Sequence, residues 1–221
     1  MTIFEQLAAD ITQLLTSSRV SVTFSKNTLT PESRLHDLKN VLTSVFALRC
    51  PASVAESIRI DDEIYVYWKG RADGGDVPVF GEFFLRSVLV FALVNDLSET
   101  FTAKPYNAVD LRQTRVFDYY AHHGGPIHAL LKVTARTVSD GVLVFNERDV
   151  FPTTLDYDGY LAALHRTKGF VFWQYLYCEQ VRPETYELDA IRRGLEFVER
   201  EFPSEDYSDL WRRVDRLSAV P

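Results

Sequence analysis

The stretch EIYVYWKG, residues 63–70, alternates its side chains with the period of two that is typical of a β-strand. The two faces of this strand would hold Ile64, Val66 and Trp68 on one side, and Tyr65, Tyr67 and Lys69 on the other. The turn signal ADGGD follows at 72–76. Beyond it, residues 77–95 are rich in β-branched and aromatic side chains, which predicts one or two further strands.

Three later segments continue the strand pattern: residues 115–120, 127–135 and 141–146. The breaks between them, HHGGP and VSDG, are short enough for hairpins. Consecutive strands that are joined by short connections pair mostly in antiparallel fashion. The middle of the chain therefore predicts one mostly antiparallel sheet.

Helical patterns flank this sheet on both sides. In LDYDGYLAALHRTKG (155–169), Asp156 is the expected N-cap and Gly169 the expected C-terminal stop. Amphipathic helices are also expected over 3–15, after Thr30, over 188–202 and over 207–217. Helices, then strands, then helices predict a single α+β domain over residues 1–221. Its parts are an N-terminal helical part at 1–50, the sheet at 58–146 and C-terminal helices at 153–217.

The chain has 221 residues and a formal net charge of −7, which argues against a nucleic-acid partner because phosphate binding needs a basic face. Its two cysteines, Cys50 and Cys178, stand beside large apolar residues and are expected to be reduced thiols. The N-terminus has no early Lys or Arg, and the longest apolar run, at 88–94, is far too short to cross a membrane. These features predict a cytoplasmic protein.

Three of the five histidines gather in the stretch YAHHGGPIH, residues 120–128. A metal site here would use His122, His123 and His128, with Asp118 as a further ligand. Because neighbouring residues of an extended chain point to opposite faces, a polar hairpin tip is the favoured interpretation. The chain has no G-x-S-x-G, H-E-x-x-H, C-x-x-C or phosphate-loop motif, so no catalytic residue and no cofactor are expected.

Aromatic residues make up nine of the 34 residues from 145 to 178, about twice the 13% of the whole chain. They are interpreted first as a core layer between the sheet and the C-terminal helices. The alternative is that some of them line a groove or a protein-binding surface, since Tyr and Trp serve interfaces well.

Three segments together resemble the SUKH superfamily, the group that includes the Smi and Knr cell-wall regulators of yeast. They are PASVAESIRIDDEIYVYWKG with the FGEFFL strand, DGVLVFNERDVFPTTLDYDGYLAALHRTKGFVFWQYLYC, and AIRRGLEFVEREFPSEDYSDL. The resemblance covers residues 50–212. It implies an α+β fold with a curved sheet flanked by helices, no enzymatic activity, and a sheet and loops that meet a partner.

Many bacterial members of that superfamily are immunity proteins that bind and neutralise toxins, often nucleases. The sequence is therefore expected to encode a non-enzymatic immunity-type binding protein whose partner is a protein such as a basic toxin domain. The residues expected to contact this partner are Asp61, Asp62, Glu63, Asp73, Asp76, Glu82 and Trp173. The alternatives are a metal-dependent enzyme that uses the histidine cluster, and a regulatory scaffold that binds a small ligand or a peptide in the aromatic region.

Overall fold

The computed structural model describes residues 3–29, 44, 47–51, 54, 60–71, 77–86, 97, 106, 109–120 and 127–219. The helix that was expected after Thr30 and the second half of the strand segment 77–95 lie outside these residues.

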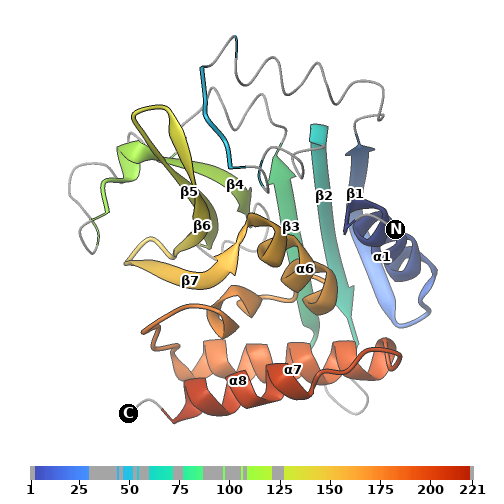
Figure 1. The fold of residues 1–221 in the computed structure, drawn as a ribbon. Coiled ribbons are helices and arrows are strands. Elements are labelled where there is room, and N and C mark those ends of the chain that lie inside the picture. The colour runs from blue at the N-terminus through green and yellow to red at the C-terminus, as the bar shows by residue number, and fades with distance from the viewer. Residues whose placement is uncertain are drawn as a thin grey trace.

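Within these ranges the strands form two antiparallel sheets (Figure 1). The first has the order β1 (Val20–Leu29), β2 (Ile60–Gly70) and β3 (Val79–Arg86). The second is a meander of β4 (Thr114–Tyr119), β5 (His128–Thr134), β6 (Thr137–Phe145) and β7 (Val150–Asp156). The predicted α+β class and antiparallel pairing are confirmed. The prediction of one sheet is wrong, and β7 was not predicted.

The two sheets meet where β3 lies against β4. The β4–β5 register shifts between Val116 and Asp118, so that Phe117 is an extra residue in β4. At this shift the carboxylate of Asp118 accepts a hydrogen bond of 2.7 Å from the backbone N–H of Phe84 in β3. A side chain therefore takes the place that a backbone carbonyl would have in a continuous ladder, and this splits the predicted sheet into two.

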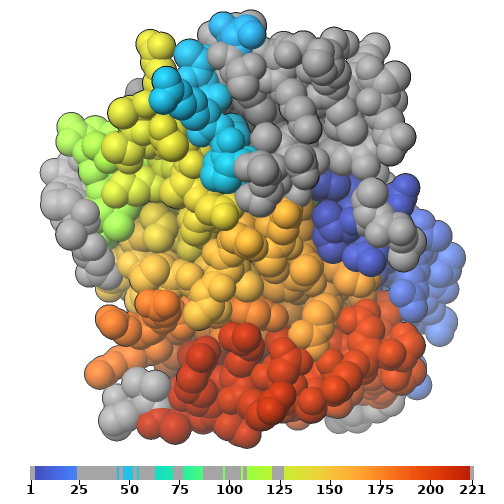
Figure 2. All heavy atoms as spheres, viewed as in Figure 1, coloured from blue at the N-terminus to red at the C-terminus, as the bar shows by residue number. Residues whose placement is uncertain are grey.

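The helices cover one side and one end of these sheets. They are α1 (Ile3–Thr16), α6 (Tyr157–Thr167), α7 (Thr185–Glu201) and α8 (Ser208–Ser218), with short 3₁₀ turns at Leu111–Gln113 (η3) and Trp173–Leu176 (η4). Figure 1 shows α6 in front of the strands and the antiparallel pair α7 and α8 across one end. The space-filling view shows α7 and α8 together forming that end of the molecule (Figure 2). Among the described helices, none has both the length and the apolar character needed to cross a membrane.

The ends of α6 follow the sequence signals. Asp156 is the N-cap, and its side chain accepts a 2.7 Å hydrogen bond from the N–H of Gly159. The helix stops because Lys168 and Gly169 both adopt left-handed backbone angles, with φ of 51° and 68°. Both predictions for this helix are confirmed.

Trp68 is the centre of the main core. Its ring is fully buried and stacks on Phe197 of α7, with the ring centroids 5.4 Å apart. Its indole N–H donates a 2.8 Å hydrogen bond to the carbonyl of Lys168 at the end of α6. On β3, the ring lies against Gly81, where a Cβ atom would come within 2.1 Å of it. One side chain of β2 thus packs against β3, α6 and α7 together.

The Gly81→Ala substitution is expected to destabilise the protein by at least about 2 kcal/mol, because neither the backbone of β3 nor the hydrogen-bonded indole can move away. Gly141 in β6 is a matched control, since nothing lies within 4 Å of its ideal Cβ position. The Gly141→Ala variant should stay within about 0.5 kcal/mol of the wild type in urea unfolding. Equal midpoints for the two variants would contradict this account of the core.

Candidate functional site

The structure describes only some of the acidic residues that were expected to contact a partner. Asp73 and Asp76 lie outside the described residues. Asp61 and Asp62 belong to β2, but their side chains also fall outside the description. Glu63, the next residue of β2, is partly exposed.

Two of the expected contact residues are wrong, because Glu82 and Trp173 are both 0% exposed. Glu82 belongs to β3, where it pairs with Tyr67 of β2. Its carboxylate accepts a 3.1 Å hydrogen bond from the hydroxyl of Tyr65. Trp173 lies in η4 and packs against Tyr160 of α6, with the ring centroids 4.8 Å apart. Neither side chain can meet a partner without unfolding its surroundings.

The histidine cluster is only partly described, because His122 and His123 lie outside the described residues. Asp118 and His128 occupy successive register positions on neighbouring strands, so their side chains point to opposite faces of the second sheet. Asp118 faces the main core, whereas the ring of His128 stacks beside Tyr119 on the other face. One ion cannot take both as ligands, and a site that combines them is therefore wrong. Among the described residues, no three His, Cys, Asp or Glu side chains are grouped for a metal ion.

Asp118 instead begins a buried chain of hydrogen bonds. Its second carboxylate oxygen accepts a 2.6 Å bond from the hydroxyl of Tyr160. Tyr160 in turn accepts from the side-chain amide of Gln174, at 3.3 Å. Burial, opposed by these hydrogen bonds and assisted by the nearby Glu82, raises the pKa of Asp118 to about 7.

The same chain continues to the backbone of Phe172. The hydroxyl of Tyr120 donates to the side-chain oxygen of Gln174 at 2.7 Å, and it accepts from the backbone N–H of Phe172 at 3.1 Å. These bonds run from β4 through α6 and η4 to one residue of the loop between α6 and η4. The buried polar groups of the core thus fix the position of Phe172.

Phe172 has an unusual backbone, with φ of 66° and ψ of 12° in the left-handed region. For a bulky residue this conformation costs on the order of 1–2 kcal/mol and needs support from its surroundings. The hydrogen bond to Tyr120 gives one support, and a hydrogen bond of 3.0 Å from the N–H of Val171 to the carbonyl of Phe80 gives another. Strained residues of this kind are frequent at binding sites, and this one borders a groove.

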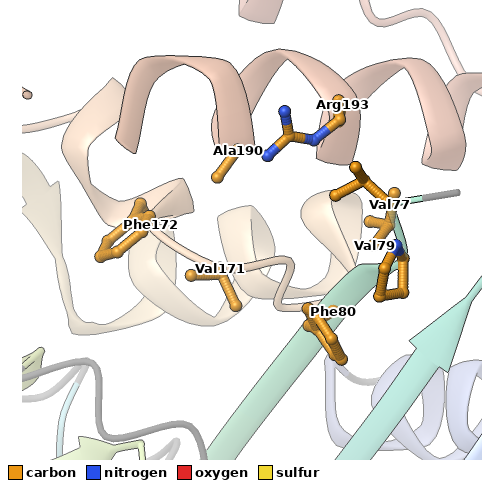
Figure 3. A pocket seen from close by; sticks show the side chains of 8 residues that line it. Val77, Val79, Phe80, Val171, Phe172, Ala190 and Arg193 are labelled. Atoms are coloured by element: carbon orange, nitrogen blue, oxygen red, sulfur yellow. The ribbon is translucent and has the colours of Figure 1, made fainter. Parts of the chain in front are cut away.

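The groove lies between the start of β3 and α7 and has a volume of about 330 Å³. Its lining residues are Val77, Pro78, Val79, Phe80, Val171, Phe172, Ala190 and Arg193. Figure 3 shows Ala190 and Arg193 on the helix wall, Val77, Val79 and Phe80 on the strand wall, and Val171 and Phe172 toward one end. The volume is at the small end of the range for ligand pockets, and the lining is almost entirely apolar.

One polar group reaches into this apolar setting. The guanidinium of Arg193 extends over the groove in Figure 3, and it has no ion-pair partner among the described residues. Val77, in the lining of the groove, is 53% exposed to solvent, and Tyr186, on the same helix as Ala190, is 55% exposed. The ring of Tyr186 meets that of Phe172 edge-on, with the centroids 6.1 Å apart.

The groove residues on α7 were missed from the sequence. Tyr186, Ala190 and Arg193 are spaced by four and three positions, which places them on one face of the helix. This face differs from the core stripe of Ile191, Leu195 and Val198 that the sequence pattern predicts. A second, short apolar face beside the core stripe was the available signal for a binding surface on this helix.

Comparison of the chain with protein-family models, with curated proteins and with solved structures finds no match in any of the three. The resemblance to the SUKH superfamily therefore stays a prediction from the sequence.

The buried carboxyl of Asp118 predicts a pH dependence of stability. Its pKa is about 7 in the folded protein, against 3.8 for an unperturbed aspartate side chain. Between these values the folded state holds a proton that the unfolded chain has released, so this group's stabilisation is complete below pH 3.8 and is lost as the pH rises through about 7. The Asp118→Asn variant keeps an acceptor for the N–H of Phe84 and cannot ionise. Between pH 4.5 and 7.5, its free energy of unfolding is expected to fall by roughly 3 kcal/mol less than that of the wild type.

The measurement is urea unfolding across this pH range. Asp215→Asn, which removes an exposed carboxylate from α8, is the control and should follow the wild-type profile. Parallel profiles for the wild type and Asp118→Asn would show that Asp118 ionises normally in the folded protein.

Proposed function

We propose that this protein is a non-enzymatic binding protein and that the groove between β3 and α7 is its contact surface. The observation that supports this most strongly is an apolar groove whose lining residue Val77 is exposed, together with the exposed ring of Tyr186 against the groove residue Phe172. Exposed apolar surface beside a groove is typical of interaction sites. The strained Phe172, held by the buried hydrogen-bond chain, keeps this surface in one shape before a partner arrives.

We propose further that the partner is a protein toxin that this chain neutralises by direct binding, as the SUKH resemblance implies. The net charge of −7 favours encounter with a basic partner, since opposite charges attract over distances of about a Debye length. Glu63, with Asp61 and Asp62 beside it in β2, is the described part of the acidic segment that would contribute to this attraction. A cytoplasmic location belongs to the same proposal.

The local chemistry of the groove defines what part of the partner it would accept. Its apolar walls suit one or two apolar side chains, and the guanidinium of Arg193 suits a carboxylate next to them. An overall basic toxin can present such a segment, because long-range attraction and short-range contact depend on different groups. The expected occupant is therefore a surface segment of the toxin with an apolar anchor and an adjacent acid.

A second candidate is the regulatory scaffold that binds a small ligand. The groove volume of about 330 Å³ favours it, since pockets for small molecules begin near this size. An apolar carboxylic acid would use the same walls and the same guanidinium. The two candidates differ in the size of the partner and not in the surface that it meets.

The test is titration calorimetry with the purified, inactivated product of a toxin-type gene adjacent to the gene for this chain. The Ala190→Arg substitution fills the groove and places a second cation beside Arg193, so we expect at least a roughly tenfold loss of affinity. Ala162→Arg on α6 is the matched control, because Ala162 is exposed and lies outside the groove, and it should bind like the wild type.

Equal binding by the two variants would exclude the groove as the contact surface. Failure of any adjacent toxin-type product to bind would overturn the toxin proposal. A melting temperature that rises with an apolar carboxylic acid in the wild type, but not in Ala190→Arg, would then favour the small-ligand candidate.

A further inference from the structure

A compact group of positive charges lies at the end of the first sheet, where β1 begins and β2 ends. Val20 pairs with Gly70 and Ser21 with Lys69, and the N–H of Arg71 donates to the carbonyl of Arg19. This register sets Arg19 opposite Arg71. Ser21 is two residues from Arg19, and Lys69 is two residues from Arg71. Because side chains alternate along a strand, all four side chains share one face.

At this end of the sheet, this face is exposed to solvent. The intervening residues Val20 and Gly70 point the other way: Val20 packs against the main core, and Gly70 lies against the ring of Phe197. Arg19, Lys69 and Arg71 are all exposed. We call the group of Arg19, Ser21, Lys69 and Arg71 the basic block.

The positive charge of the basic block is only partly balanced. Glu201, at the end of α7, pairs with Arg19 and with Arg200, at 3.3 Å in each case. The guanidinium of Arg200 also donates to the carbonyl of Arg71 at 3.4 Å. For the side chains of Lys69 and Arg71, the described part of the chain supplies no carboxylate partner. Among the described residues, Lys69 and Arg71 thus bring two positive charges without a carboxylate partner, in a chain whose net charge is −7.

Such an arrangement is expected to lower the stability of this end of the sheet. Like charges that face each other across an antiparallel pair repel, and Arg19 and Arg71 are in this position. Lys69 is fixed beside them, with its ammonium 5.4 Å above the ring of Phe80 on β3. The block also lines a groove of about 370 Å³, whose lining includes Ser18 as well. An anion in this groove would remove the repulsion.

We propose that the basic block binds the dianionic phosphate group of a small phosphorylated molecule. Two guanidinium groups can each offer a pair of parallel N–H donors to phosphate oxygens, and Lys69 adds a compact charge. The hydroxyl of Ser21 lies on the same face as a neutral donor. A nucleic-acid backbone is a poorer fit, because it needs a long basic face and this block is confined to one corner of an acidic protein. The proposal does not depend on the groove beside α7.

The test uses inorganic pyrophosphate as the probe, at constant ionic strength, with phosphorus NMR to follow binding and thermal unfolding to follow stability. Wild-type protein should show saturable binding at roughly millimolar concentration, and its melting temperature should rise with the probe. The double substitution Lys69→Gln with Arg71→Gln should weaken binding at least roughly tenfold. Without the probe, this variant should be no less stable than the wild type, because the repulsion is gone.

The matched control is Lys132→Gln with Arg212→Gln, which removes the same charge from exposed positions on β5 and α8. This control should bind pyrophosphate like the wild type. Equal binding by the two double variants would mean that only the overall charge matters, and absence of saturable binding by the wild type would mean that the block is not an anion site. Either result overturns the proposal.

Discussion

The indole of Trp68 is the contact on which the arrangement of this molecule depends. It is buried between Gly81 and Phe197, and its N–H is bonded to the carbonyl of Lys168. That carbonyl belongs to a residue with left-handed backbone angles, whose ammonium is itself buried and paired with Asp10 of α1 at 3.0 Å. The packing of one tryptophan thus fixes the end of α6, and the end of α6 in turn holds α1. Because Trp68 also sets α7 against β3, it defines both walls of the apolar groove.

A second set of contacts shapes the end of that groove and is polar throughout. A buried polar group costs free energy unless it is hydrogen-bonded, and in this core Asp118, Tyr160, Gln174 and Tyr120 satisfy one another in sequence. The last bond of the chain holds Phe172 in its strained conformation. Polar residues that resemble catalytic groups in composition therefore have a structural task that they perform in a closed interior. A paired, buried carboxyl is evidence of a function only when it also lies at a surface that a partner can reach.

The sequence predicts best where the chain's local chemistry decides the outcome. The alternation in 63–70 predicted β2, and the capping signals at Asp156 and Gly169 predicted the limits of α6. Both predictions succeeded because these features depend on residues only a few positions away in the sequence. The burial of Glu82 could not be predicted, because alternation shows that the two faces of a strand differ and does not show which parts of each face are covered in the folded protein. The split into two sheets depends on a bulge at Phe117, which no local motif announces. The groove needs 77–80, 171–172 and 190–193 together, so only the tertiary structure brings it into view.

The distribution of charge is informative where it departs from the average. An acidic chain repels anions as a whole, so a site that attracts them must concentrate its cations and keep carboxylates away. In the proposed anion site, strand register places the cations of β1 and β2 on one face, while in the apolar groove α7 places Arg193 above apolar side chains. A cation with apolar surroundings favours an amphipathic acid, whereas a cluster of cations with hydroxyls favours a small, highly charged anion. Under both proposals, the net charge of −7 influences which molecules approach, and the two cationic sites select which of them bind.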